Sequence, residues 1–272
     1  MVSTSLSLAE KAKTIFLSKK FFWFLGHAIV LTCSSFFYFN LALSPFGSQD
    51  LSTYYSWALL GALLSYSILI HRVIQYFRSN SSSLYRLLLD DNVQYTTMAL
   101  VWYFSMPNSV ALLPYYIYSS FHAVNYLTKT IFPTFFSGPS SPQSRRSSQQ
   151  QMTSSIIQKG NSLRCWMQNK YGPSMRYVSR YEVIVIPTWL TLDYILGLIG
   201  ITMGVSTLTY TIYFFFLILR YRTSGYVRDA FTYARIQCDR HLIGSPLESP
   251  YQSIRAQLLM IGQSLSGPEA AH

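Results

Sequence analysis

The sequence predicts an all-α polytopic membrane protein, with about six membrane helices arranged as three hairpins. Three long stretches, residues 21–70, 87–128 and 181–219, contain none of the 21 lysines and arginines. Half of all residues are apolar, and only 11% are charged. A bilayer excludes positive charge, at a cost of roughly 2.5–3.5 kcal/mol per Lys or Arg at mid-depth. These three stretches are therefore expected to lie in a membrane.

The net charge of +11 is the second informative feature. A basic chain can bind nucleic acid, but here the basic residues flank apolar segments, as expected for attraction to an anionic cytosolic leaflet. The expected partner is therefore the lipid bilayer, and nucleic acid is not expected. The three cysteines, Cys33, Cys165 and Cys238, are too far apart for a disulfide framework or a metal-ligand pair. No cofactor is expected.

The first charge-free stretch is expected to form a complete transmembrane hairpin. A span needs about 20 apolar residues, and each charge-free stretch is about twice that length. Turn-forming residues at 44–50 divide the first stretch into two spans. The expected domains of this part are a cytosolic N-terminus at 1–20, a transmembrane hairpin at 21–71 and a cytosolic loop at 72–91.

The second and third stretches are expected to form membrane hairpins at 92–128 and 182–220. Residues 105–108 break the second stretch, and Gly197, Gly200 and Gly204 break the third. The resulting helices are short for complete crossings. They are able to dip into the membrane and return if their turns are shielded from lipid.

The positions of the basic clusters predict the orientation, because Lys and Arg are enriched in cytosolic loops. If every charge-free stretch forms a hairpin that enters and leaves the membrane on the same side, all the basic segments share the cytosolic face. These segments are both termini, the 129–181 linker and the 221–272 region. If the second and third stretches each crossed once, the basic linker would be luminal. Three hairpins are therefore favoured.

The linker contains a Ser/Gln/Pro-rich segment at 137–158 that is predicted to be disordered, since it has few residues able to form a core. Arg145 and Arg146 precede two serines, a pattern that suits a kinase preferring basic residues before its acceptor. Ser148 is the candidate phosphorylation site, and an unmodified solvated linker is the alternative.

The C-terminal region, 221–272, shows two amphipathic patterns at helical spacing, which favours helices lying in the membrane interface. Packing against cytosolic loops or a partner helix is the alternative. The candidate membrane-binding residues are Val227, Ala230, Phe231, Ala234 and Leu242 in the first helix, and Ile254, Leu258, Ile261 and Leu265 in the second. Candidate contacts with anionic lipid are Arg228, Arg235 and Arg240.

No recognised catalytic or metal-binding motif is present in the sequence. Asp90-Asp91 and Glu182 stand at expected helix starts, where carboxylates cap free amides. His122, Asn125 and Asp193 are the remaining polar residues of interest. They define the alternative function, a small multipass membrane transporter or enzyme with a polar site.

Several short strings resemble the transmembrane protein 33/pore-membrane protein 33 family of the endoplasmic reticulum (ER) and nuclear envelope. The resemblance covers roughly residues 20–130 and 178–265 and lies in the order and spacing of the strings. They are Leu87-Leu88-Leu89-Asp90-Asp91 with Tyr95; Phe121-His122-Ala123 with Tyr126 and Lys129; Glu182 with Pro187; and Phe216-Leu217-Ile218-Leu219-Arg220-Tyr221.

This resemblance implies a non-enzymatic role in organising the ER and nuclear membranes, including nuclear pore complex assembly or distribution. It also implies an ER and nuclear-envelope location, with reticulon-type ER-shaping proteins and nucleoporins as partners. A homo-oligomer remains an open alternative. The residues themselves indicate only hairpins and amphipathic helices on one side, an asymmetry that would generate or sense curvature.

Overall fold

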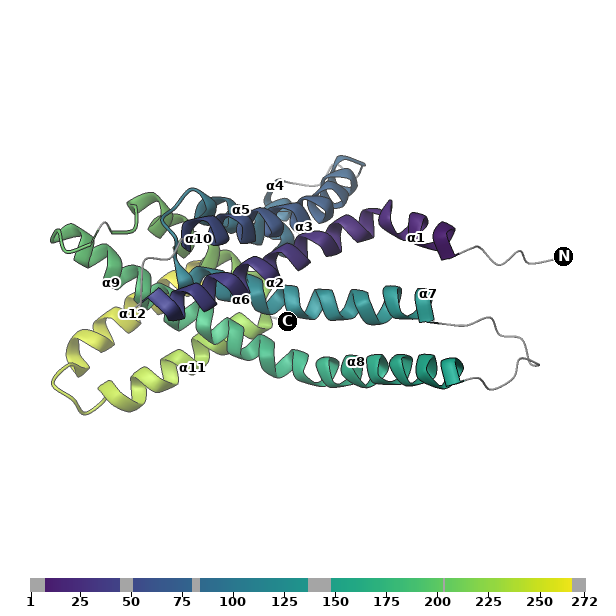
Figure 1. Cartoon of the computed structure of the whole chain (residues 1–272). Helices are drawn as coiled ribbons and strands as arrows, with labels where there is room; N and C mark the ends of the chain where they lie inside the picture. The colour runs from purple at the N-terminus through teal and green to yellow at the C-terminus, as the bar shows by residue number, and fades with distance from the viewer. Residues whose placement is uncertain (1–7, 45–50, 80–83, 137–147, 203, 266–272) are drawn as a thin grey trace.

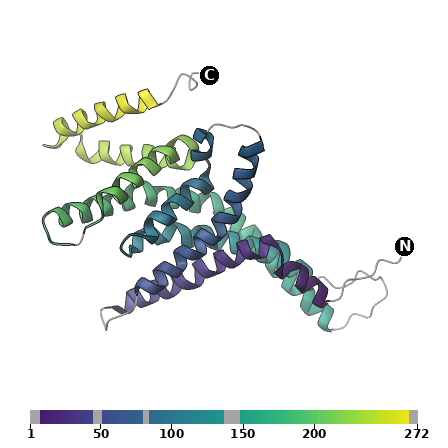
Figure 2. The same cartoon turned by 90° about the horizontal axis from the view of Figure 1, so that it is seen from above.

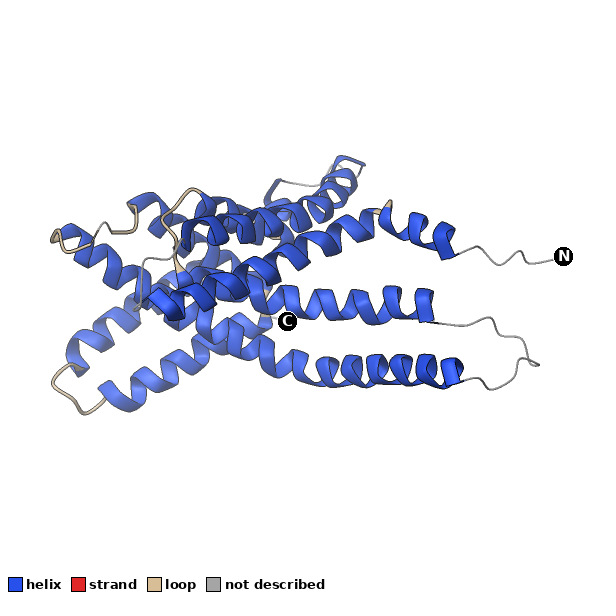
Figure 3. Cartoon of the chain, in the orientation of Figure 1, coloured by secondary structure: helices blue, strands red, loops and turns tan. Residues whose placement is uncertain are grey.

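The computed structural model describes residues 8–44, 51–79, 84–136, 148–202 and 204–265 (Figure 1). Within these ranges every regular element is helical (Figure 3). Three helical segments are long and apolar enough to cross a membrane: Lys19–Leu43, Leu51–Arg78 and Gln158–Leu198. The all-α membrane class is thus confirmed, whereas the number of six membrane helices stays a prediction.

The first hairpin consists of α2 (Lys19–Leu43) and α3 (Leu51–Ser79), preceded by α1 (Leu8–Phe16). Ser18 caps α2, because its Oγ accepts a hydrogen bond from the Phe21 amide at 3.1 Å. The two long helices touch through glycine: a Cβ added at Gly26 would lie 2.6 Å from the Gly61 carbonyl oxygen. Such small residues let membrane helices approach closely.

The second hairpin consists of α5 (Asp91–Tyr103) and α6 (Ser109–Tyr126), preceded by the short helix α4 (Leu84–Leu88). Asp90 caps α5 by accepting from the Asn92 amide at 2.9 Å, which confirms its predicted capping role. The chain turns between α5 and α6, where the break was expected. However, α6 continues without interruption through a π-helical turn, η2 (Leu127–Ile131), into α7 (Phe132–Phe136).

The first helix of the third hairpin also extends beyond the expected membrane segment, because it begins well before residue 182. The 33-residue α8 (Ser148–Arg180) runs through the π-helical η3 (Tyr181–Val185) into α9 (Ile186–Leu198), and α10 (Thr207–Thr223) follows. Gly200 and Gly204 have φ angles of 76° and 64°, left-handed values that glycine allows at this turn.

The expected disorder at 137–158 differs from the structure in its second half. Residues 148–158 form the first turns of α8. Glutamine and methionine are good helix formers, and this segment contains Gln149, Gln150, Gln151 and Met152. Residues 137–147 lie outside the described ranges.

The C-terminal region forms two helices, α11 (Gly225–Leu242) and α12 (Glu248–Leu265). Figure 2 shows them beyond α9 and α10, on the side away from α2 and α3. Pro250 lies in the first turn of α12, where a proline is tolerated because its missing amide would have no helical partner.

The core lies where the three hairpins meet, and it is rich in aromatic residues. Tyr55 of α3, Trp102 of α5 and Tyr213 of α10 are each at most 2% exposed. Tyr95 of α5 packs its ring 5.6 Å from Phe216 of α10. The hydroxyl groups of buried tyrosines usually have hydrogen-bond partners, and the Tyr95 hydroxyl bonds to Glu182 Oε1.

Candidate functional site

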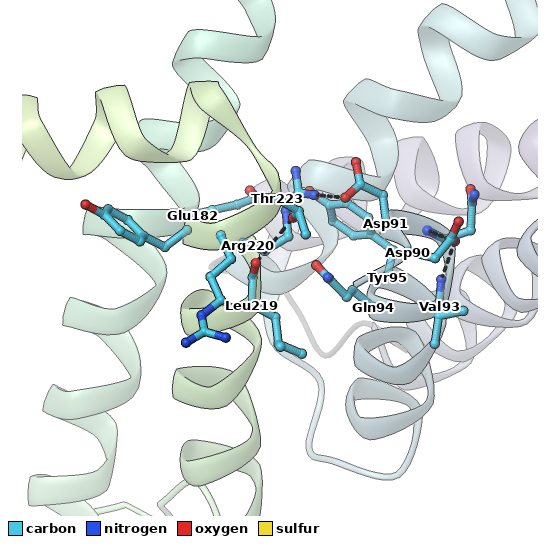
Figure 4. A network of polar contacts seen from close by, with 12 residues as sticks. Asp90, Asp91, Val93, Gln94, Tyr95, Glu182, Leu219, Arg220 and Thr223 are labelled. Atoms are coloured by element: carbon cyan, nitrogen blue, oxygen red, sulfur yellow. Dashed lines mark hydrogen bonds and ion pairs between the residues drawn. The ribbon is translucent and has the colours of Figure 1, made fainter. Parts of the chain in front are cut away.

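A cluster of polar side chains joins the second and third hairpins (Figure 4). We define the interhairpin cluster as Asp91 and Tyr95 of α5, Tyr118 of α6, Glu182 of η3, and Tyr213 and Arg220 of α10. The Tyr95 hydroxyl donates to Glu182 Oε1 at 2.8 Å and lies 2.8 Å from the Tyr118 hydroxyl. The Tyr213 hydroxyl donates to the Glu182 backbone carbonyl at 2.7 Å.

Arg220 holds the other side of this cluster. Its Nη1 donates to Asp91 Oδ1 in an ion pair, and its guanidinium carbon lies 5.0 Å from the centre of the Tyr95 ring. The Arg220 side chain is 6% exposed, whereas that of Asp91 is 58% exposed. A buried guanidinium is tolerated when it is paired and stacked on an aromatic face. The end of α10 is thereby tied to the start of α5.

Glu182 is only 2% exposed, within a helix that is continuous on both sides. Its assignment as a helix-start carboxylate is therefore wrong, because α8 runs into η3 without a new N-terminus. The π-helical turn at η3 interrupts the regular register of this long helix, and such turns recur at sites of structural or functional importance. The buried Glu182 therefore contacts α5 through its side chain and α10 through its backbone carbonyl, so the cluster links these helices.

Sequence reasoning missed this cluster because its members are far apart in the chain. Asp91 and Arg220 are separated by 129 positions. One signal was present: the acid stands at one end of a charge-free stretch, and the base directly follows another such stretch. Opposite charges at neighbouring ends of two membrane hairpins are candidates for pairing.

His122 belongs to a different interface, between α2 and α6. Its ring lies 4.8 Å from that of His27 and 5.2 Å from that of Trp23. His27 Nδ1 is 3.0 Å from the Ser119 hydroxyl. His122 is therefore part of an aromatic packing layer between these two helices. Asn125, one turn further along, is exposed.

Asp193 lines a cavity of about 630 Å³ between the α5–α6 turn and the start of α10. The cavity walls include Trp102, Trp189 and Thr209, but neither His122 nor Asn125. The structure thus does not bring the three residues of the alternative site together. Among the described residues there is also no group of three or more His, Cys, Asp or Glu side chains able to hold a metal ion.

Two candidate membrane-binding residues of α11 are buried in the protein instead. Val227 is 0% and Ala230 is 1% exposed, and both belong to the main core. Their assignment to a lipid-facing stripe is wrong, because α11 packs this face against α8 and η3. Phe231 is 36% exposed, and Ala234 and Leu242 are half-buried.

The three candidate lipid-binding arginines of α11, Arg228, Arg235 and Arg240, are all exposed. Arg228 also donates to the backbone carbonyls of Tyr221 and Arg222, at 3.3 and 3.2 Å, near the end of α10. Arg228 is therefore engaged in part by the protein itself.

The second helix of this region, α12, is fastened to α11 by polar contacts. The Tyr251 hydroxyl donates to Asp239 Oδ1 at 2.5 Å, and Arg255 forms an ion pair with the same oxygen at 3.3 Å. The hydrogen bond to Asp239 raises the pKa of the Tyr251 phenol. Four candidate membrane-binding side chains and the candidate phosphorylation site lie outside the described side chains: Ile254, Leu258, Ile261, Leu265 and Ser148.

Long apolar helices, a buried polar joint and basic helices outside the hairpins define a polytopic α-helical membrane protein. Residues 5–254 match the family described as Transmembrane protein 33/Nucleoporin POM33, and the chain belongs to this family. The resemblance inferred from the short strings is thereby confirmed.

Similar proteins occur in fungi and animals. Nucleoporin POM33 of Chaetomium thermophilum is 30% identical over 253 residues, which cover 89% of this chain and 84% of the relative. Tetra-spanning protein 1 of Schizosaccharomyces pombe is 28% identical, covering 86% and 79%. Transmembrane protein 33 of Homo sapiens is 25% identical, covering 82% and 78%. No solved structure matches the chain significantly.

These names are those of nucleoporin and transmembrane proteins, not of enzymes. The residues that suggested the family also meet in space. Asp91, Tyr95, Glu182 and Arg220 each belong to one of the resembling strings, and all four lie in the interhairpin cluster. Their shared location gives these residues a structural role.

Proposed function

We propose that this protein is a non-enzymatic integral membrane protein of the ER and nuclear envelope. It organises membrane shape and contributes to nuclear pore complex assembly or distribution. The observation that carries this proposal is the family match over residues 5–254, which includes relatives named as nucleoporins. The hairpin architecture and the basic helices outside it support the same function.

The mechanism that we propose is asymmetric insertion into the bilayer. The 13 residues of α5 give a length of about 20 Å, whereas the hydrocarbon core is about 30 Å thick. The α5–α6 pair therefore inserts without a complete crossing, and the name of the Schizosaccharomyces pombe relative, which counts four spans, supports this arrangement. Short hairpins and amphipathic helices on the cytosolic side expand that leaflet, which favours curvature.

The proposed partners are lipids, nucleoporins and reticulon-type ER-shaping proteins. Both termini face the cytosol in this proposal, so the N-terminal helix, the 129–181 linker and α11–α12 are available to cytosolic proteins. A homo-oligomer is compatible with this arrangement. Self-association would raise the local density of inserted hairpins.

Imaging of a fluorescently tagged copy in its own cells tests this proposal. The expected pattern is a nuclear rim that overlaps a nucleoporin marker, together with the ER network. Removal of the gene should redistribute pore complexes around the rim, and re-expression should restore them. A tagged and functional copy confined to another organelle would contradict the proposal.

A further inference from the structure

The helix α8 is basic from residue 159 onward. Its 33 residues include Lys159, Arg164, Lys170, Arg176 and Arg180, but no aspartate or glutamate. An element with this composition is electrostatically complementary to an anionic surface. Only the exposed part of α8 is free to contact such a surface.

One face of α8 packs against the rest of the protein. Gly160 is buried against Phe132 of α7, since a Cβ at this position would lie 2.7 Å from the phenylalanine ring. Met175 and Val178 are 3% and 2% exposed. Near the end of α8, the Arg180 guanidinium lies 3.9 Å from the centre of the Tyr233 ring of α11.

Another face of α8 is exposed and carries large apolar side chains between lysines. We call this set the α8 stripe: Lys159, Leu163, Trp166, Lys170 and Tyr177. The spacings of four, three and four residues place Lys159, Leu163, Trp166 and Lys170 in one line along the helix, and Tyr177 follows seven residues later, beyond Pro173. Leu163, Trp166 and Tyr177 are 44%, 56% and 71% exposed.

A polar flank runs beside the α8 stripe. It consists of Ser162, Cys165 and Asn169, all of them exposed. Between residues 159 and 170 the exposed surface of α8 thus carries an apolar, lysine-bearing line beside an uncharged polar line, whereas Arg176, further along, is exposed on the polar side. This division is unexpected for a helix that is solvated evenly on its outer side.

The stripe has the composition of a membrane interface. Tryptophan and tyrosine prefer the headgroup level, where the ring is apolar and one edge is polar. Lysines can bury their methylene stems there while the ammonium groups reach anionic phosphates and carboxylates. An acidic protein surface would complement the lysines, but it would not explain the preference for interfacial aromatics.

The position of α8 in the fold brings it to the bilayer. The helix continues without a break through η3 into α9, within the candidate membrane span Gln158–Leu198. Figure 2 shows the N-terminal part of α8, together with α7, bending away from the direction of α2 and α3. Where α2 and α3 cross the bilayer, a helix inclined to them lies closer to the membrane plane than they do.

We propose that the α8 stripe lies in the headgroup region of the cytosolic leaflet and binds anionic phospholipids. The segment between the second and third hairpins is then a surface-bound helix, in addition to α11 and α12. This proposal requires a cytosolic linker but does not depend on any role at nuclear pores.

Full-length protein with Cys33, Cys165 and Cys238 changed to Ser provides the background for the test. Leu163→Cys in the stripe and Ser162→Cys in the polar flank are each labelled with an environment-sensitive fluorophore. The two neighbouring positions are both exposed, so they are matched in label access and in their expected tolerance of substitution. Each variant is reconstituted into nanodiscs of phosphatidylcholine, with or without phosphatidylserine.

The label at 163 should show blue-shifted emission and strong quenching by lipids that carry a quencher near the headgroup, whereas the label at 162 should show neither. Phosphatidylserine should increase the difference, and added salt should reduce that increase because it screens the lysines. Lys159→Gln with Lys170→Gln should abolish the phosphatidylserine effect.

Equal emission and equal quenching at 162 and 163 in both lipid mixtures would overturn the proposal. A blue shift at 163 that persists in detergent without lipid quenching would also overturn it, and would assign the stripe to a second copy of the chain. Circular dichroism and thermal unfolding of each labelled variant establish that the fold is intact.

Discussion

Tyr95 is the residue on which the interhairpin cluster depends most. Its hydroxyl contacts both Glu182 and Tyr118, and its ring lies under the Arg220 guanidinium. One side chain therefore supports an acid and a base that come from the two ends of the third hairpin. In a low-dielectric environment each of these contacts is strengthened, and each missing contact is costly.

We predict that Tyr95→Phe lowers the free energy of unfolding by about 1.5–3 kcal/mol, the usual range for a hydrogen bond to a charged group. The ring and its packing are retained, so the loss reports on the hydroxyl. Denaturant unfolding in detergent measures it. Tyr103→Phe on the same helix is the control, and an equal effect of both changes would contradict the role of the cluster.

The ion pair between Arg220 and Asp91 should respond asymmetrically to substitution. Arg220→Gln removes the buried partner and its contact with the Tyr95 ring, so we expect a loss of about 3–5 kcal/mol. Asp91→Asn should cost less than Arg220→Gln, because the Asp91 side chain is 58% exposed, its amide oxygen can still accept a hydrogen bond, and the contact of Arg220 with the Tyr95 ring is kept. Comparable losses of unfolding free energy from the two changes would contradict this asymmetry, in which Arg220 is the buried partner and Asp91 the exposed one.

A change at both His122 and Asp193 should leave function intact. His122 packs against Trp23 and His27, while Asp193 lines a cavity that His122 does not reach. We therefore expect the His122→Asn and Asp193→Asn double variant to retain its location and its ability to complement a deletion. A variant that is correctly located and well expressed but inactive would instead indicate chemistry or transport.

The sequence could predict local polar roles but not long-range ones. Asp90 was recognisable as a helix cap, because a cap is decided by residues two and three positions away. The pairing of Glu182 with Tyr95 spans 87 positions and needed the fold. The same applies to His122, whose neighbours come from α2.

At the scale of elements, the hairpin turns were predictable and the outer helix ends were not. Turn-forming residues marked the breaks at 44–50 and 105–108 and the glycine-containing turn before α10. Lys129 and Arg180 mark charge boundaries, but α6 and α8 both pass through them as continuous helices with π-helical turns. A lysine or arginine signals the end of the membrane segment, and it does not end a helix.

Helical periodicity alone also could not distinguish a protein-facing from a lipid-facing side of α11. We predict that Val227→Asp destabilises the fold by several kcal/mol, since it places a charge in the main core. Phe231→Asp, at a 36% exposed position, should lower the unfolding temperature less, because its ring lies outside the main core and contacts Tyr221 of α10. Thermal unfolding of both variants tests this, and equal melting temperatures would contradict the packing of α11 against α8.

At the scale of the whole molecule, the proposed function requires one arrangement: three hairpins that return to the same side. This arrangement places every basic cluster, from the N-terminus to α12, at the cytosolic leaflet. It also places Asp91 and Arg220 at neighbouring hairpin ends, as their ion pair requires. The functions proposed for α8 and for α11–α12 all need this orientation.

Protease protection in sealed microsomes tests this arrangement most directly. Epitope tags are placed at the N-terminus, between residues 137 and 147, and at the C-terminus, with a luminal protein as the control for sealed membranes. We expect added protease to remove all three tags while the luminal control stays intact. A linker tag that is protected until detergent is added would contradict the three-hairpin arrangement.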